Sequence, residues 1–420
     1  MKVTAALLSS ATAALEEMLR FSGPADQVLS RHFRAHRQLG QQERAFIAEA
    51  SFAVLRRKRS LEAAAGSAAP GALLAATLLR VLGFSGRSLE GLVDKALLAR
   101  IHGAKAAPRA PLPDAVRADL PDWVWERLGA QYGGDEAMRI AQGLLNAAPL
   151  DLRVNLARIG REEALERLAK DGIEGSPTPH SPAGIRLAGK PAINRHPMFE
   201  EGLVEVQDEG SQLLAWLLAP RRGEMVADYC AGAGGKTLAI CMLMRGAGRV
   251  YAMDVSAKRL AALAPRAARA GVSSIHPMVL DGDNDSRVKR LAGKIDRVLV
   301  DAPCSGFGTL RRNPDLKWRH GPQAVAELAA KQLRILGAAA RLVKPGGRLV
   351  YATCSILQEE NEAVTAAFQG AHPEYALLSC KALLAAQNIQ LDTGEQLRLW
   401  PHRQGTDGFF AATFQKNPLS

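Results

Sequence analysis

The chain has 420 residues, of which 47% are hydrophobic, and it carries a formal net charge of +12. That length exceeds one ordinary hydrophobic core, so we expect two or three domains. The composition is that of a soluble globular protein, and no apolar stretch reaches transmembrane length. Five cysteines without metal-ligand spacing argue against a disulfide framework or a zinc site and favour reduced thiols in the cytosol.

Positive charge is concentrated near the N-terminus. Residues 1–120 hold 17 Lys and Arg against 10 Asp and Glu, a net of +7. Such an excess is typical of a nucleic-acid footprint, although a solvated basic face has the same composition. Leu7 and Leu8 faintly resemble a secretory signal, but Glu16 and Glu17 follow so soon that we interpret this segment as an amphipathic helix.

The first half of the chain predicts helices and then a small mixed region. Apolar residues recur at helical spacing in residues 5–19 and 43–61, and strand signals are nearly absent up to residue 100. Residues 104–113, rich in Ala and Pro, predict a linker. Helices are then expected at 123–128 and 136–145, followed by a small α+β region with strands at 150–155, 184–187 and 202–206 around a helix at 162–169.

Strands and helices alternate from about residue 207 onward. This pattern predicts a mainly parallel sheet covered on both faces, as in an α/β Rossmann-like domain. We therefore divide the chain into a helical domain (1–110), a region of linker, helices and small α+β subdomain (111–206), and an α/β domain (207–420). The expected strands are 225–229, 249–253, 275–279, 297–301, 348–353 and 409–414, and the main helices are 236–244, 257–270, 323–343 and 359–368.

Two cysteines follow two of these predicted strands. Cys304 lies in residues 301–306 (Asp-Ala-Pro-Cys-Ser-Gly), and Cys354 lies in residues 351–355 (Tyr-Ala-Thr-Cys-Ser). The carboxyl ends of strands are where open α/β sheets bind ligands, so two thiols at this edge favour covalent chemistry. Burial as small apolar side chains is the alternative, because that is the usual place of a free cysteine.

A glycine-rich turn follows the first strand of the α/β domain. Residues 228–237 read Asp-Tyr-Cys-Ala-Gly-Ala-Gly-Gly-Lys-Thr, and Cys230 stands where a phosphate-binding P-loop requires its first glycine. Asp254 closes the second strand and suits a ribose diol, or alternatively a helix N-cap. Asp281 follows the third strand and suits an adenine edge, or alternatively an Asp-Gly turn. These features alone are compatible with either NAD or S-adenosylmethionine.

Six motifs follow one another along the chain, at residues 207–212, 234–237, 301–309, 313–315, 351–355 and 406–410. In this order they resemble the motifs of the RNA (cytosine-5)-methyltransferases, most closely those of the bacterial 16S ribosomal RNA branch of RsmB type. The resemblance is specific over residues 145–420. Residues 37–44 and 53–57 extend it more weakly, because they resemble the NusB-like helical RNA-binding domain of that branch.

The resemblance implies a reaction and roles for the two thiols. It implies that S-adenosylmethionine methylates carbon 5 of a cytosine, that Cys354 attacks carbon 6, and that Cys304 assists product release. Related DNA enzymes attack from a Pro-Cys like that at Cys304, so the residues themselves leave the nucleophile open. Asp301 is expected to hydrogen-bond the cytosine edge. Lys236 is expected to support the glycine-rich loop or the base pocket, or alternatively to be a solvated helix start.

The remaining implied properties concern the cofactor, the partner and the location. RNA, in the form of 16S rRNA or a small-subunit precursor, is the expected partner of a cytoplasmic monomer without metal or membrane attachment. Arg311, Arg312 and Lys317 follow Cys304 and are expected to lower the pKa of a thiol or to contact phosphate. The predicted cofactor contacts are Cys230, Ala231, Gly232, Gly234, Gly235, Lys236, Asp254, Arg259, Asp281 and Asp301.

The sequence departs from the family pattern in one place, and two other functions are compatible with it. The family loop commonly reads Cys-Ala-Ala-Pro-Gly-Gly-Lys-Thr, whereas Gly232 and Ala233 replace the Ala-Pro here and are expected to loosen the loop. An amino-group methyltransferase is one rival, but it typically uses Asn/Asp-Pro-Pro-Tyr where this chain has Asp301 to Cys304. A non-catalytic RNA-binding assembly factor on a methyltransferase fold is the other.

Overall fold

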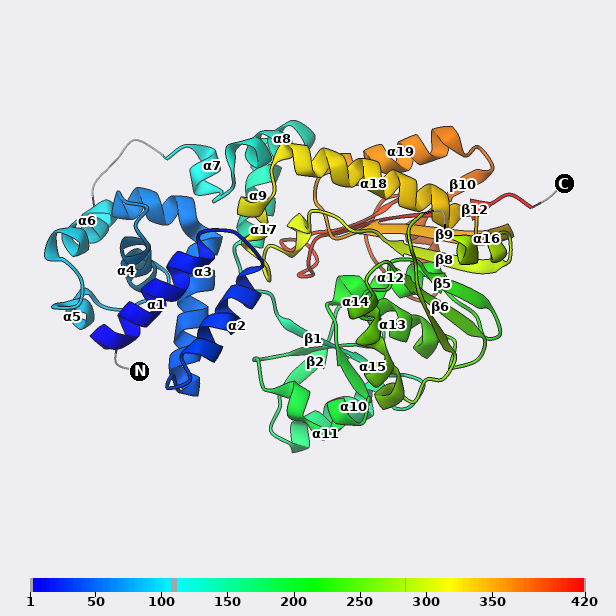
Figure 1. Ribbon diagram of the computed structural model, residues 1–420, viewed down its shortest axis with the longest axis horizontal. Coiled ribbons are helices and arrows are strands. Elements are labelled where there is room, and N and C mark those ends of the chain that lie inside the picture. The colour runs from blue at the N-terminus through cyan, green and yellow to red at the C-terminus, as the bar shows by residue number, and fades with distance from the viewer. Residues whose placement is uncertain (1–2, 107–111, 284, 419–420) are drawn as a thin grey trace. The chain divides into compact units, whose positions relative to one another are not determined.

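The computed structural model describes residues 3–106, 112–283 and 285–418 (Figure 1). The chain divides into two compact units. Unit 1 contains Met1–Ala147 and Thr309–Pro322, and unit 2 contains Ala148–Gly308 and Gln323–Ser420. Residues Thr309–Pro322 lie within the predicted α/β domain (207–420) but belong to unit 1. The sequence did not predict this assignment.

The described residues of unit 1 form helices and no strand, as predicted. α6 runs on to Ala106, so residues 104–106 of the predicted linker are helical, and residues 107–111 lie outside the described part. No single helix in the described ranges is long and apolar enough to span a membrane, and α3 with α4 meets that criterion only as a pair bent by 96°. The helices are α1 (Ala5–Met18), α2 (Ala25–Ala35), α3 (Gln41–Ala65), α4 (Pro70–Arg80), α5 (Gly86–Leu89), α6 (Lys95–Ala106), α7 (Asp114–Arg117), α8 (Asp122–Tyr132), α9 (Gly134–Leu144) and α17 (Leu316–Arg319).

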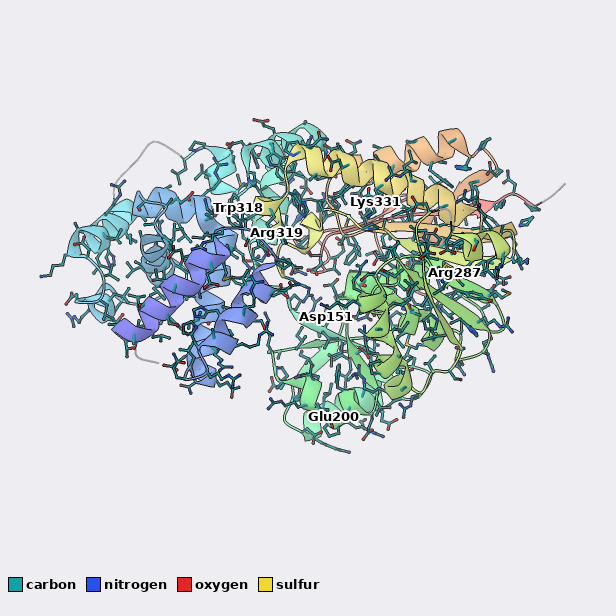
Figure 2. All side chains as sticks on the ribbon, viewed as in Figure 1. Asp151, Glu200, Arg287, Trp318, Arg319 and Lys331 are labelled. Atoms are coloured by element: carbon teal, nitrogen blue, oxygen red, sulfur yellow. The ribbon has the colours of Figure 1, made fainter. Side chains whose placement is uncertain are left out.

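The short helix α17 is held in unit 1 by buried polar contacts. Lys317 Nζ donates to the carbonyl oxygens of Arg56 (2.7 Å) and Asp119 (2.6 Å). The indole of Trp318, labelled in Figure 2, donates to the carbonyl of Leu55 at 2.8 Å. Burial lowers the pKa of Lys317 to about 7. The expectation that Lys317 supplies positive charge beside a thiol is therefore wrong, because its amine is committed to backbone carbonyls of unit 1.

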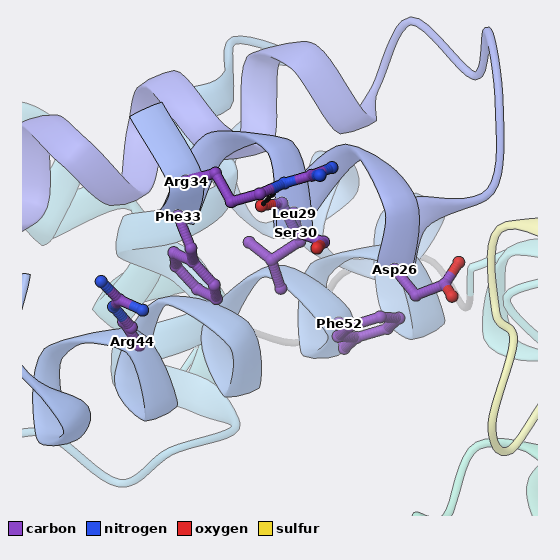
Figure 3. A pocket seen from close by; sticks show the side chains of 7 residues that line it. All are labelled: Asp26, Leu29, Ser30, Phe33, Arg34, Arg44 and Phe52. Atoms are coloured by element: carbon purple, nitrogen blue, oxygen red, sulfur yellow. Dashed lines mark hydrogen bonds between the residues drawn. The ribbon is translucent and has the colours of Figure 1, made fainter. Parts of the chain in front are cut away.

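An open pocket lies between α2 and α3 of unit 1 (Figure 3). Leu29, Phe33 and Phe52 supply apolar surface, while Arg34 and Arg44 stand at its edge. The Arg44 guanidinium lies 5.7 Å from the centre of the Phe33 ring. Aromatic rings beside arginines offer both a stacking surface and positive charge.

Unit 2 begins with a small antiparallel sheet in the order β2-β3-β1-β4. Asp151 on β1 (Figure 2) accepts two hydrogen bonds from Arg186 of β3, at 2.8 and 2.9 Å. Glu209 joins this sheet to the following domain, since its carboxylate accepts from the backbone N–H groups of His180 (2.6 Å) and Ser181 (2.7 Å). The elements are β1 (Leu150–Val154), α10 (Arg161–Lys170), β2 (Gly175–Pro177), β3 (Gly184–Leu187), η1 (Ile193–Arg195), α11 (Pro197–Glu200) and β4 (Val204–Val206).

The large sheet of unit 2 has the strand order β10-β12-β9-β8-β5-β6-β7, with β11 paired to β12. Its β5 to β9 pairings are parallel, while β12 runs antiparallel to β9, β10 and β11. The strands are β5 (Met225–Asp228), β6 (Arg249–Asp254), β7 (Ile275–Val279), β8 (Ile295–Asp301), β9 (Val343–Thr353), β10 (Tyr375–Leu378), β11 (Leu397–Leu399) and β12 (Phe409–Lys416).

Helices cover both faces of this sheet. Successive strand residues point to opposite faces, and here apolar residues point to both, so each face packs against helices. Val298, Val300 and Tyr351 join a core with α18 and α19, whereas Leu299 and Val350 join a core with α12, α13 and α20. The expected helix 257–270 is two helices that meet at Ala262. The helical elements are α12 (Glu209–Leu218), α13 (Gly235–Leu243), α14 (Ala257–Ala261), α15 (Leu263–Ala270), α16 (Ser286–Arg290), η2 (Phe307–Thr309), α18 (Pro322–Ala340), η3 (Gln358–Glu360), α19 (Glu362–Ala371) and α20 (Cys380–Ala385).

Candidate active site

Two neighbouring parallel strands bring the two predicted thiols together. β8 ends at Asp301 and β9 at Thr353, and Asp301 is the register partner of Ala352. The chain continues from each strand into a short loop, and the Sγ atoms of Cys304 and Cys354 lie 3.3 Å apart. Both residues are partly exposed. This separation allows one thiol to hydrogen-bond to the other.

Backbone hydrogen bonds tie three of the sequence motifs together beside these thiols. The Gly308 N–H donates to the carbonyl of Cys354 at 2.8 Å, and the Gly408 N–H donates to the carbonyl of Gly308, also at 2.8 Å. A Cβ at Gly308 would lie 2.0 Å from the Gly408 carbonyl oxygen, so the approach requires glycine. Motifs distant in sequence thus lie together in one loop cluster.

The surroundings of Cys304 favour its protonated form. Hydrogen bonding to Cys354, burial, and the charges of Cys354 and Glu360 together hold the pKa of the Cys304 thiol well above its usual range. Either sulfur can donate in the hydrogen bond between the two residues, and the thiolate is the reactive form of a cysteine.

Lys236 supplies positive charge within unit 2. Its Nζ lies 2.6 Å from Oδ2 of Asp301 and 5.9 Å from the centre of the Phe409 ring. Burial alone would lower the pKa of Lys236, but the ion pair with Asp301 outweighs burial and raises it. Lys236 is therefore not a solvated helix start, since only 13% of its side chain is exposed.

The glycine-rich turn connects β5 to α13 and is fixed by Asp254. Gly232 and Gly234 adopt φ angles of +55° and +83°, which glycine tolerates best. The Asp254 carboxylate accepts from the N–H of Gly232 (2.9 Å) and of Ser256 (2.7 Å), and from the Arg259 guanidinium (3.0 Å). Ser256, not Asp254, caps α14. A carboxylate has about four acceptor sites, so a ribose hydroxyl still fits there.

The other predicted cofactor residues differ in burial. Ala231 is buried, and burial followed by the charge of Asp301 raises the pKa of the Cys230 thiol well above its usual range. Asp281 is exposed and lies 3.5 Å from Arg287, which Figure 2 labels on α16. Gly235 begins α13, whose N-terminus therefore faces the turn. The structure thus places the predicted cofactor residues at the carboxyl ends of β5, β6, β7 and β8 and in the loops and first helical turns that follow.

Sequence reasoning missed Asp228, the last residue of β5. Its carboxyl group is buried, Oδ2 accepts from Thr237 Oγ1 at 2.7 Å, and Oδ1 has no hydrogen-bond partner within the described chain. Burial raises the pKa of Asp228 to about 7. The signal was available, because an acidic residue ends the strand before the glycine turn.

The residues around the turn fit S-adenosylmethionine. A buried carboxyl oxygen without a partner suits a donor such as the cofactor ammonium group, because buried polar atoms are otherwise paired. A Cβ built at Gly232 would meet nothing within 4 Å, so the turn borders open space. Asp254 adds acceptor capacity for a ribose at the end of the neighbouring strand.

Comparison with known proteins agrees with this geometry. The family model described as 16S rRNA methyltransferase RsmB/F matches residues 215–415, and the ferredoxin-like domain model of the same family matches residues 120–194. The solved structure of PH0851 has a TM-score of 0.80 at 26% identity and covers 99% of this chain and 100% of that one. A methyltransferase homolog from Pyrococcus horikoshii has a TM-score of 0.62 at 30% identity, over 73% of this chain and 100% of that one.

A curated relative covers a similar share of the chain. The probable ribosomal RNA small subunit methyltransferase B of Synechocystis is 35% identical over 81% of this chain and 76% of its own length. The chain belongs to the RsmB/F family of 16S rRNA methyltransferases, which are S-adenosylmethionine-dependent.

Proposed function

We propose that this protein methylates carbon 5 of a cytosine in 16S rRNA through a covalent bond between Cys354 and the base. The observation that carries the proposal is the 3.3 Å separation of the Cys304 and Cys354 sulfurs at the ends of two parallel strands. An amino-group methyltransferase needs no second thiol at this position. The family name supports the RNA class, and the thiol pair supports carbon 5 as the target.

The residues divide the reaction between them. The Cys354 thiolate bonds to carbon 6, which makes carbon 5 electron-rich enough to take the methyl group supplied by S-adenosylmethionine. Loss of the carbon 5 proton to a base then allows the Cys354–carbon 6 bond to break. Cys304 assists this elimination. The 3.3 Å separation of the two sulfurs supports the assignment, because Cys304 can exchange a hydrogen bond with Cys354 while the bond to carbon 6 forms and breaks.

The charged groups beside the thiols bind and orient the base. Asp301 lies at the end of β8 and accepts from Lys236, so the pair presents a fixed carboxylate to the amino edge of cytosine. Asp254, Asp228 and the turn around Gly232 and Gly234 hold the cofactor. The target base leaves its stack to reach such a pocket.

The helical region at residues 1–110 serves as a NusB-like RNA-binding domain in this proposal. Its net positive charge and the pocket lined by Phe33, Phe52 and Arg34 support that role. Residues 111–206 contribute a second RNA-binding subdomain, and residues 207–420 carry catalysis. We further propose that the protein acts in the cytoplasm as a monomer.

Mapping 5-methylcytosine in 16S rRNA tests the function directly. A strain that lacks the gene should lose methylation at one cytosine, and the intact protein should restore it. The Cys354→Ala variant should not restore it. If rRNA methylation is unchanged by loss of the protein while ribosome assembly is impaired, the protein is instead a non-catalytic assembly factor.

A further inference from the structure

The carboxylate of Glu360 is buried beneath the two cysteine loops. Glu360 ends η3, seven residues beyond β9, and its side chain is fully enclosed, with 0% of the residue exposed. A buried acidic side chain is costly unless it is fully hydrogen-bonded, so its partners reveal what it holds.

Glu360 binds the residue that follows each cysteine. Its Oε2 accepts from Ser305 Oγ and from Ser355 Oγ, both at 2.5 Å. Its Oε1 accepts from the Ser305 N–H at 2.8 Å and from Gln332 Nε2 at 3.0 Å. One oxygen therefore bridges the two serines, whose own Oγ atoms lie 3.3 Å apart. The cysteines Cys304 and Cys354 are their immediate neighbours in the chain.

The four donors match the acceptor capacity of a carboxylate. An ionised carboxylate accepts through about four lone-pair positions and donates none. All four donors to the Glu360 carboxylate are themselves buried or partly buried. An amide in place of the carboxylate would turn an N–H₂ group toward at least one of these donors, which leaves a buried group unpaired.

Glu360 is itself held from the strand side. The Tyr351 hydroxyl donates to the Glu360 carbonyl at 2.6 Å, and the Asn361 side chain donates to the carbonyl of Ser355 at 3.0 Å. Tyr351 belongs to β9, so its hydrogen bond fixes the position of Glu360 relative to the sheet. Such a fixed support defines the geometry of groups attached to it.

We propose that Glu360 is a positioning residue that sets the separation of the Cys304 and Cys354 thiols by holding Ser305 and Ser355 on one carboxylate. Its importance for catalysis rests on the proposed function, but its effect on the thiols does not. Glu360 touches neither sulfur in this arrangement. It holds the cysteine loops through the N–H of Ser305 and the hydroxyls of Ser305 and Ser355. Its negative charge also raises the pKa of the Cys304 thiol. Loss of that charge alone would favour the thiolate and speed oxidation, so slower disulfide formation reports lost positioning.

Disulfide trapping measures the thiol separation without RNA or cofactor. Diamide, a diazene oxidant, takes up the two thiol hydrogens and becomes a hydrazine while the S–S bond forms. The unaltered protein should form the Cys304–Cys354 disulfide readily, because the sulfurs need to approach only from 3.3 Å to about 2 Å. In Glu360→Gln the initial rate should fall by about tenfold or more, on the scale of one charge-assisted hydrogen bond.

Matched variants separate positioning from general destabilisation. Ser305→Ala and Ser355→Ala each remove one hydroxyl oxygen and should slow disulfide formation less than Glu360→Gln does. When either serine substitution is added to Glu360→Gln, the rate of disulfide formation should fall little further, because the serines act through the same carboxylate. Glu327→Gln, at an exposed position of α18, should leave the rate unchanged. If Glu360→Gln does not fold, as judged by thermal denaturation, the two serine variants carry the test. An unchanged disulfide rate in a folded Glu360→Gln protein, or in both serine variants, overturns the proposal.

A second measurement links positioning to catalysis. If the thiols act as proposed, Glu360→Gln should slow product release and accumulate a covalent protein–RNA adduct, while Glu360→Asp should restore release in part because it keeps the carboxylate. A different result is that disulfide formation is slower in Glu360→Gln while no protein, altered or unaltered, forms a covalent adduct with RNA. That result would leave Glu360 as a positioning residue and would contradict the covalent mechanism. The two failures are therefore distinguishable.

Discussion

The sulfur atoms of Cys304 and Cys354 lie within hydrogen-bond distance, at 3.3 Å, although the residues follow different strands. If Cys354 attacks the base, Cys354→Ala should form no covalent RNA adduct and transfer no methyl group. Cys304→Ala should still attack and methylate but should release product slowly. A protein–RNA band that survives denaturing electrophoresis and depends on S-adenosylmethionine should accumulate with that variant.

The double variant provides the control, because attack precedes release. It should show no band. An adduct from Cys354→Ala with none from Cys304→Ala would reverse the two roles. Full activity in both single variants would mean that the cysteines are structural.

Asp254 is predicted to bind the cofactor ribose. Its carboxylate already holds the Gly232 N–H, so Asp254→Ala should both remove a ligand contact and loosen the turn. S-adenosylmethionine affinity should fall by about tenfold to hundredfold in calorimetry, as for hydrogen bonds to a charged group. Asp281→Ala, at an exposed position, should have a smaller effect, and equal affinities in all three proteins would remove Asp254 from the site.

Gly234 should not tolerate a side chain. Its φ is +83°, and an added Cβ would lie 2.1 Å from Leu263 Cδ1. Gly234→Ala should therefore lower the free energy of unfolding in urea by more than the roughly 1 kcal/mol expected from backbone strain alone. Gly246→Ala is the matched control, because its φ is +70° and nothing lies within 4 Å of the added Cβ. Equal losses would show that the Leu263 contact yields without cost.

Lys317 should make stability depend on pH. Burial lowers its pKa to about 7 from an unfolded value of 10.5, so between these values the unfolded chain binds a proton that the folded chain has released. Stability should therefore rise with pH in this window, by up to about 1.4 kcal/mol per pH unit, and gain nothing below pH 7, where both states are protonated. The difference between the unaltered protein and Lys317→Met isolates this slope, and parallel pH profiles would contradict it.

Exposed arginines of unit 1 are predicted to contact phosphate. Substituting Arg31, Arg34 and Arg37 by Gln should weaken RNA binding and reduce the slope of log affinity against log salt, by about 0.7 to 0.9 per lost contact. Cofactor binding should be unaffected. Lys331→Gln on α18, labelled in Figure 2, serves as a single-charge comparison in unit 2. Unchanged affinity and slope in the triple variant would mean that this basic surface has another use.

Local sequence patterns predicted the α/β sheet well because its central strands are continuous apolar runs. Residues 275–279 were predicted with their observed bounds as β7, and β5, β6, β8 and β12 differ by one or two residues at an end. β9 was predicted at its end but begins five residues earlier. Strands β2, β10 and β11 were not predicted, since these three- and four-residue segments owe their conformation to pairing with β3 and β12.

The site was predictable only where function leaves a local motif. The two thiols and the glycine turn have such motifs, whereas the role of Glu360 depends on four hydrogen bonds from three residues that folding brings together. Lys317 shows the opposite error. Its closeness to Cys304 in sequence suggested an electrostatic role, but its burial against Arg56 and Asp119 is decided by long-range packing.

The inclusion of residues Thr309–Pro322 in unit 1 has a consequence for the order of folding during synthesis. Helices α1 to α9 leave the ribosome first, yet α17, which Lys317 and Trp318 anchor, is made only after residues 148–308. At roughly 5 to 20 residues per second, that delay is about 10 to 30 s. The full set of contacts in unit 1 therefore cannot form until this late segment is made, and until then the main-chain carbonyls of Leu55, Arg56 and Asp119 lack the donors that Lys317 and Trp318 supply.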